Sequence, residues 1–213
     1  MKQPYENVYL GNFIFALGFQ AAKTRKGLND KVVQLVQQTP DEGLLNDLFI
    51  KWSGKSYILE FKRSKEKIKK ELDKTTKNNI NIQLNDKNNE WALNLANKSH
   101  FLGFGDSDNL HFIDYSSIHK EIEKTTPLDK FCSSILDKEG NLGLNHEELV
   151  GYLDFIKEAS GSSSEGCGGF IINVSGDGSL NMIPYDSVEL LSQALDAELE
   201  LESEQEPPLS FDR

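Results

Sequence analysis

The chain has 213 residues, of which 38% are hydrophobic and 27% are charged, and its net charge is −11. This composition excludes a chain that is disordered throughout, and the absence of any apolar run of about 18 residues excludes a membrane-spanning helix at the level of sequence. Glu6 and Asn7 stand where a signal peptide would be apolar, and the two cysteines are far apart. We therefore expect a cytoplasmic protein with free thiols.

The first part of the sequence predicts two helices followed by a strand hairpin. Residues 5–23 are strongly apolar and fit a packed helix, or a strand followed by a helix, and periodicity does not decide between them. The pair Asn29-Asp30 can cap a second helix over residues 30–38, which a Thr-Pro pair would end. Residues 44–62 alternate around a Ser-Gly pair, which is typical of a hairpin.

Helix and hairpin signals follow in the middle of the chain. Ser64 can cap a helix over residues 64–77, whose lysines we expect to point mostly outward. The segment 80–84 alternates like a strand, whereas 91–95 fits a strand or a helix. Residues 100–115 predict a second hairpin.

The rest of the chain predicts helices, a linker, a third hairpin and an acidic tail. Residues 117–160 indicate helices that break near 125–127 and near 140–141. A Gly- and Ser-rich linker at 161–169 leads into a hairpin at 169–185. A short helix at 187–195 precedes a tail from Asp196 onward in which acidic residues alternate, and we expect this tail to be mobile.

The net charge is distributed unevenly along the chain. Residues 1–98 contain 17 lysines and arginines against 11 acidic residues, a net charge of +6, so the remainder carries −17. The basic first part could bind phosphate groups, or its lysines could simply be solvated. The acidic second part would repel a nucleic acid and suits a basic protein partner.

The hairpin at 44–62 has a register that can be derived from its turn. If Ser53-Gly54 is the turn, Leu48 pairs with Leu59 and the next pair outward is Asp47 with Glu60. Alternation then sorts the side chains onto two faces. One face is wholly apolar: Leu48, Ile50, Trp52, Tyr57, Leu59 and Phe61. The other carries Asp47, Phe49, Lys51, Ser56, Ile58, Glu60 and Lys62.

Two carboxylates directly opposite each other destabilise a sheet unless something offsets their charge. A divalent cation could do so, because Mg²⁺ prefers carboxylate oxygens. Lys62 lies on the same face as Glu60, two residues along, and could instead neutralise one carboxylate in a plain ion pair. Both interpretations stay open at this point.

An acidic residue on one strand, a turn, and Glu-x-Lys on the paired strand resembles the PD-(D/E)XK nuclease superfamily, the restriction-endonuclease-like fold. Here the motif is Asp47, twelve intervening residues, and Glu60-Phe61-Lys62. The helices expected at 64–77 and 30–38 stand where that fold has helices after and before the motif strands. Two features depart from the pattern: Asn46 replaces the proline before the aspartate, and no further strand is evident ahead of it, between residues 39 and 44.

The resemblance implies metal-assisted hydrolysis of phosphodiester bonds in DNA. Asp47, Glu60 and the Phe61 carbonyl would bind Mg²⁺ or Mn²⁺, and Lys62 would position or activate the attacking water. Some members use an additional helical glutamate, for which Glu6 or Glu42 could serve. The basic residues that would contact the DNA backbone are Arg63, Lys65 and Lys69.

Two other signals compete with this interpretation. Residues 137–149 look like a calcium-binding EF-hand loop, but Leu142 occupies the position that requires glycine, so an ordinary helix–turn–helix is favoured. His100 and His111 could face each other across the second hairpin and bind a metal, or they could serve surface or packing roles.

These observations together predict an α/β protein with a restriction-endonuclease-like core, in which helices flank a central mixed sheet, and an α+β C-terminal extension. We expect the nuclease-like core over residues 1–116, helices and a hairpin over 117–195, and the acidic tail over 196–213. The leading functional hypothesis is a magnesium-dependent nuclease. The alternative is a non-catalytic interaction protein on the same fold that binds a basic partner through its acidic C-terminal half.

Overall fold

The computed structural model describes residues 4–24, 47–52, 54–106, 109–137 and 139–161 with their side chains, and the backbone of 31–35, 169–174 and 180–185. The strands are β1 (Lys31–Leu35), β2 (Leu48–Trp52), β3 (Lys55–Lys62), β4 (His100–Gly105), β5 (Leu110–Asp114), β6 (Thr126–Pro127), β7 (Gly169–Val174) and β8 (Leu180–Tyr185). The helices are α1 (Glu6–Thr24), α3 (Lys65–Ile68), α4 (Thr75–Leu84), α5 (Glu90–Ser99), α6 (Leu128–Ile135) and α7 (His146–Ser160), with 3₁₀ segments η1 (Lys69–Asp73), η2 (Lys87–Asn89) and η3 (Tyr115–Ser117).

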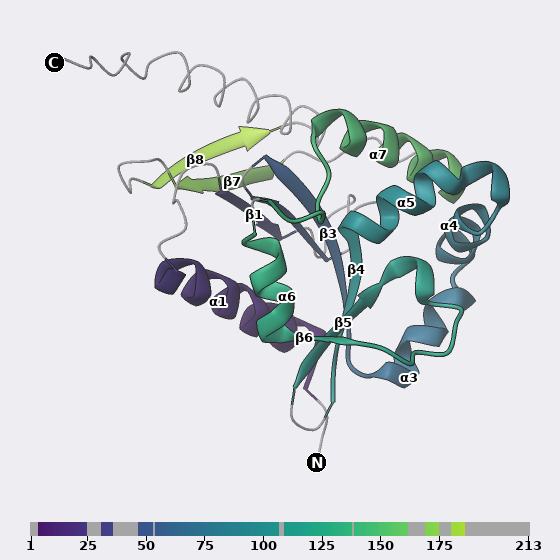
Figure 1. Cartoon of the computed structure of the whole chain (residues 1–213), viewed down its shortest axis with the longest axis horizontal. Helices are drawn as coiled ribbons and strands as arrows, with labels where there is room; N and C mark the ends of the chain where they lie inside the picture. Colours follow the sequence, from purple (N-terminus) through teal and green to yellow (C-terminus); the bar gives the residue numbers. More distant parts are fainter. Residues whose placement is uncertain are drawn as a thin grey trace, which may run out of the picture.

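The architecture is α/β, with one open mixed sheet between two layers of helices (Figure 1). The strand order is β6-β5-β4-β3-β2-β1-β7-β8. β3 and β4 are parallel, and every other neighbouring pair is antiparallel. Within the described part of the chain, no helix is both long and apolar enough to cross a bilayer.

The β2–β3 hairpin has the register that the sequence predicts. Leu48 pairs with Leu59 and Trp52 pairs with Lys55, around Gly54 at a φ of 75°. The face prediction is also confirmed, because its apolar face belongs to one core cluster: Leu48, Ile50, Trp52, Tyr57, Leu59 and Phe61. Phe49 and Ile58 belong to the cluster on the opposite face of the sheet.

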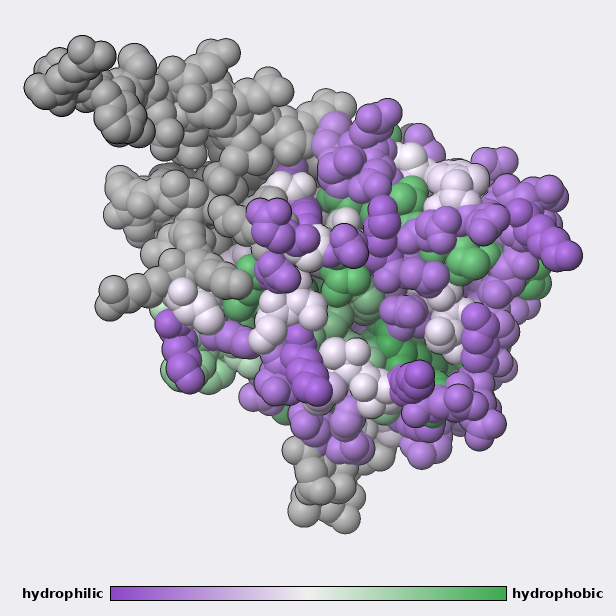
Figure 2. All heavy atoms as spheres, in the orientation of Figure 1, coloured by the Kyte–Doolittle hydropathy of each residue, from purple (hydrophilic) through white to green (hydrophobic). Residues whose placement is uncertain are grey.

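Different helices cover the two faces of the sheet. α1 and α6 pack over the apolar hairpin face through side chains such as Phe13 and Phe131. α4, α5 and α7 pack over the other face, with Leu84, Ala96 and Tyr152 in its core. Hydrophilic residues cover most of the described surface seen in Figure 2, so the apolar side chains are mainly enclosed between these layers.

Three of the predicted elements are wrong, one of them being the start of the helical region 117–160, because residues 118–125 form no helix. The segment 31–35 is strand β1, which pairs with β2, and not part of a helix over 30–38. Valine favours strands, and the pairing with β2 makes this segment part of the sheet. The segment 80–84 lies in helix α4, because Ile80 and Leu84 are buried one turn apart while Ile82 between them is 56% exposed.

The helix expected after Ser64 is divided into three pieces. Ser64 occupies the N-cap position of α3, but its side chain makes no capping hydrogen bond. η1 and α4 follow, separated by Lys74 in an extended conformation (φ −83°, ψ 119°). This break turns α4 back across the sheet, where it contacts α7.

The C-terminal segments that the structure describes pack into the same two hydrophobic clusters as residues before position 116. Ile135 of α6 and Leu149 of α7 lie in the two clusters that also contain residues from before position 116. The third hairpin is confirmed as β7–β8, and β7 extends the main sheet by pairing with β1. The predicted helix at 187–195 and the tail at 196–213 lie outside the described residues.

Helices α6 and α7 flank the segment for which an ordinary helix–turn–helix is favoured, and residues 140–145 between them form a structural strap. Leu144 exchanges backbone hydrogen bonds with Ser56 at 2.7 and 3.1 Å, and the N–H of Gly143 donates to the Lys98 carbonyl at 2.7 Å. Asn145 then begins α7 with a reciprocal capping box with Glu148. These backbone hydrogen bonds therefore connect the start of β3 to the end of α5 and to the start of α7.

Candidate functional site

Asp47 and Glu60 lie at the end of the β2–β3 hairpin, each one residue beyond the last pair of the register, Leu48 with Leu59. The N–H of Asp47 donates to the Leu59 carbonyl at 3.1 Å, so the regular pairing ends at Leu48 and the predicted pair of Asp47 with Glu60 is not part of the ladder. Both side chains are buried, with exposures of 5% and 3%.

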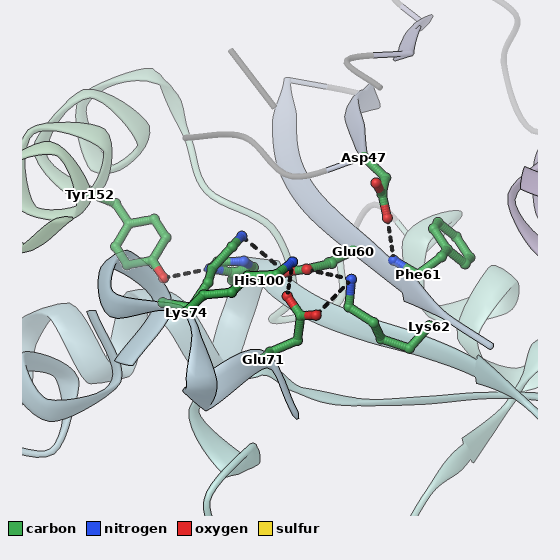
Figure 3. Close-up of polar contacts among 9 residues, drawn as sticks. Asp47, Glu60, Phe61, Lys62, Glu71, Lys74, His100 and Tyr152 are labelled. Carbon is green, nitrogen blue, oxygen red and sulfur yellow. Dashed lines mark hydrogen bonds and ion pairs between the residues drawn. The ribbon is translucent and has the colours of Figure 1, made fainter. Parts of the chain in front are cut away.

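Their carboxylates turn toward different partners (Figure 3). Asp47 Oδ2 accepts a 2.6 Å hydrogen bond from the Phe61 N–H, whereas Glu60 is held by lysines. The structure thus places the two acidic residues at the same end of the hairpin, with Asp47 directed at the backbone and Glu60 at positive charges.

Glu60 lies at the centre of a buried network of charges. Lys62 Nζ is 2.7 Å from Glu60 Oε1, and Lys77 Nζ is 3.1 Å from Glu60 Oε2. Lys62 also reaches Glu71 Oε1 at 3.4 Å, and Glu71 Oε2 pairs with the more exposed Lys74 at 2.9 Å. The plain ion pair between Lys62 and Glu60 is therefore formed, with Lys77 as a second counter-charge.

The network shifts the pKa values of its members. Burial acts to raise the pKa of Glu60, but the charges of Lys77 and Lys62 outweigh it and hold that pKa well below its ordinary value. Burial acts to lower the pKa of Lys62, and the charges of Glu60 and Glu71 raise it above its ordinary value. At neutral pH Glu60 is thus a carboxylate and Lys62 an ammonium group, which can donate hydrogen bonds but cannot accept a proton.

The pKa of Glu71 shifts in the opposite direction from that of Glu60. Burial raises its pKa, and the nearby negative charge of Glu60 raises it further. Glu6, one of the two helical glutamates considered from the sequence, acts on the pKa of Lys62 through its charge, although more weakly than Glu60 and Glu71 do. Glu42 lies outside the described residues.

His100 does not face His111, and it has the packing role that was the alternative. His111 pairs with Phe104 across the β4–β5 hairpin, whereas His100 lies beside Ile58 of β3. His100 is buried, stacks on Tyr115 with ring centres 3.9 Å apart, and shares a 2.8 Å hydrogen bond between its Nδ1 and the Tyr152 hydroxyl. Burial and the charge of Lys77 lower the pKa of His100 from 6.5 to about 3, so the ring is neutral at neutral pH.

We expect His100 to make the protein sensitive to acid. Below about pH 6.5 the unfolded chain binds a proton that the folded protein does not bind until about pH 3, so stability present above 6.5 is lost as the pH falls between these values. The loss attributable to one proton is at most about 1.4 kcal/mol per pH unit. The free energy of unfolding, measured with urea at about pH 7 and about pH 4.5, should therefore fall less between these pH values in His100→Gln than in the wild type. Equal losses would contradict this explanation.

The three basic residues predicted to contact DNA lie after β3 and are at least partly accessible. The Arg63 guanidinium stacks 4.7 Å from the centre of the Tyr5 ring and donates to the Pro4 carbonyl at 3.3 Å. Lys65 Nζ donates to the Ile122 carbonyl at 2.7 Å. Lys69 is exposed.

A cleft of about 960 Å³ opens next to the end of the motif strand. It is lined by Ser64 and Lys65 after β3 and by residues at the β4–β5 turn, including Asp106 and His111, which approach to 2.7 Å. Glu66 and Glu123 also line it, so the charges of the cleft are mixed rather than uniformly basic.

Glu71 and Lys77 are the site residues that sequence reasoning missed. Lys77 could have been identified from its helical spacing with apolar residues. One face of α4 carries all the buried residues of that helix: Lys77, Ile80, Asn81 and Leu84. Glu71 follows the buried Ile68 by three residues, which also predicts an inward position.

The predicted metal ligands fit Mg²⁺ or Mn²⁺ by their chemistry. Two carboxylates and a carbonyl are the hard oxygen donors that these ions prefer, with water completing the coordination. A strand residue projects its N–H and carbonyl from the same edge, so the hydrogen bond from Phe61 to Asp47 puts the Phe61 carbonyl on the edge that Asp47 occupies. Among the described residues, however, no three His, Cys, Asp or Glu side chains gather into a metal-binding group.

Comparisons with known proteins identify no relative. No protein-family model matches the chain, no curated protein matches it, and no solved structure matches its fold.

Proposed function

We propose that the protein is a metal-dependent nuclease of the restriction-endonuclease-like fold that hydrolyses phosphodiester bonds in DNA. The observation that supports this most strongly is the end of the β2–β3 hairpin, where the Asp47 N–H donates to the carbonyl of Leu59, the neighbour of Glu60, and Lys62 Nζ lies 2.7 Å from Glu60 Oε1. Strand β1 supports it too, because it supplies the additional strand beside the Asp strand that was not evident in the sequence. α1 precedes these strands and α3 follows them.

In this proposal Asp47, Glu60 and the Phe61 carbonyl hold Mg²⁺ or Mn²⁺. When bound, the ion supplies Lewis acidity toward the phosphate and lowers the pKa of a water molecule. Lys62 remains an ammonium group because the charges of Glu60 and Glu71 raise its pKa, so it orients the water or a phosphate oxygen by donating hydrogen bonds. Arg63, Lys65 and Lys69 contact the DNA backbone on the surface next to the motif strand.

A second candidate is a non-catalytic protein on the same fold. It is favoured by the two lysines that already neutralise Glu60 and by the acidic second part of the chain, which suits a basic protein partner. In this case the network around Glu60 would serve only to hold α4 and η1 against the sheet.

Cleavage assays distinguish the two candidates. Incubation with plasmid and single-stranded DNA in Mg²⁺ or Mn²⁺ should give cleavage that falls at least about 100-fold in Glu60→Gln and in Lys62→Met. Lys74→Met is the matched control, because it removes an exposed ammonium group that pairs with Glu71 and not with Glu60. Equal cleavage by all four proteins would indicate a contaminant and contradict the nuclease, and no cleavage by the wild type would favour the second candidate.

A further inference from the structure

Lys77 contributes a second positive charge to Glu60 from a different element. It lies in the first part of α4 on the face that also carries Ile80 and Leu84, and it is only 7% exposed. Its Nζ is 3.1 Å from Glu60 Oε2, on the other carboxylate oxygen from the one that Lys62 contacts. It also lies 5.8 Å from the centre of the Tyr115 ring, whose face favours a cation. The pocket around this ammonium group is therefore built for a positive charge.

The buried charges of the network balance without any metal ion. Glu60 and Glu71 carry two negative charges when ionised, and Lys62 and Lys77 carry two positive ones. A divalent cation bound to Glu60 would place two more positive charges directly beside the Lys77 ammonium group. Both groups are buried, so little water is present to screen these charges. Like charges at such separations repel strongly in a protein interior, so the two cations oppose each other.

We propose that Lys77 is an internal cation that occupies Glu60 in the metal-free protein and competes with the divalent ion for it. This inference rests on the proposed function, because it assumes that Glu60 is a metal ligand. The flexible four-carbon stem of lysine allows the ammonium group to withdraw when the metal binds. Lys77 thereby keeps the buried carboxylate neutralised in the absence of metal and weakens metal binding by the free energy of the contact that must be broken.

Direct measurement of Mn²⁺ binding tests this proposal. Free Mn²⁺ is quantified by electron paramagnetic resonance during titration of the wild type, Lys77→Gln and Lys77→Met, each with and without Glu60→Gln. The glutamine variant retains a hydrogen-bond donor toward Glu60 without the charge, so it separates charge from packing and provides a folded variant if methionine is not tolerated. Lys74→Met again serves as the matched control. We expect binding at least about tenfold tighter in both Lys77 variants, lost on adding Glu60→Gln, and unchanged in Lys74→Met.

The possible results separate this inference from the function on which it rests. Binding that depends on Glu60 but has the same affinity in the wild type and the Lys77 variants would overturn the competition and leave the proposed metal site intact. Weaker binding in the Lys77 variants would also overturn it, because Lys77 would then support the metal. No Glu60-dependent binding in any of the proteins would contradict the metal site itself, and with it the proposed nuclease.

Discussion

Replacing Glu60 by leucine should lower the free energy of unfolding by about 3–5 kcal/mol, because it leaves buried ammonium groups without their counter-charge. Lys62 and Lys77 both contact Glu60, at 2.7 and 3.1 Å, and both are almost inaccessible to water. Glu71 contacts Lys62 at 3.4 Å, so Lys62 keeps an acidic neighbour in this variant. Urea unfolding followed by circular dichroism measures this loss.

A double variant distinguishes the charge network from a simple packing defect. In Glu60→Leu/Lys77→Met the buried charge of Lys77 is removed together with its partner, so the double variant should be more stable than Glu60→Leu alone. If the losses of the two single variants simply add, the contact between Glu60 and Lys77 carries no coupling energy. That result would contradict the network described here.

Replacing Gly143 by alanine should cost about 2–4 kcal/mol through backbone strain and overpacking. Gly143 has a φ of 88°, and an added Cβ would lie 2.6 Å from the Lys55 Cβ and 2.8 Å from the Tyr57 Cζ. To relieve these close contacts, the strap at residues 140–145 would have to move away from the start of β3. That movement would break the paired hydrogen bonds between Ser56 and Leu144. Thermal or urea unfolding measures the effect.

Gly11→Ala is the matched control for this strain. Gly11 lies within helix α1, and an added Cβ there would have no atom within 4 Å. Alanine should therefore stabilise the protein by about 0.5–1 kcal/mol, as expected from the higher helix propensity of alanine. If Gly143→Ala lowers the free energy of unfolding by no more than the size of the change in Gly11→Ala, the strap does not constrain the fold.

The hairpin that carries the site could be derived from sequence because its signals are local. A glycine that accepts a positive φ and a strict alternation of apolar residues define the turn, the register and the two faces. That register also predicts a pair of Asp47 with Glu60, but the regular pairing ends at Leu48 with Leu59, and the Asp47 N–H donates to the Leu59 carbonyl instead. The direction of their carboxylates does not follow from the register, because it depends on the Phe61 N–H and on charges from another element.

The charge network could be derived only in part. Its motif residues Glu60 and Lys62 were evident, but Lys77 and Glu71 were read as part of one helix with an outward basic face. The extended backbone at Lys74 divides that helix and turns α4 inward. The segment that forms strand β1 is predicted as a helix from the Asn-Asp cap before it and the Thr-Pro stop after it, although its pairing partner in the fold is β2. In both cases long-range packing overrides a local preference.

Anomalous scattering from crystals soaked in Mn²⁺ tests most directly whether Asp47 and Glu60 bind one divalent cation. We expect a single strong peak about 2 Å from a carboxylate oxygen of each residue and from the Phe61 carbonyl oxygen, with the Lys77 ammonium group displaced from Glu60. A map with no peak at this position, or with Mn²⁺ bound to only one of the two carboxylates and Lys77 still on Glu60, would contradict the account.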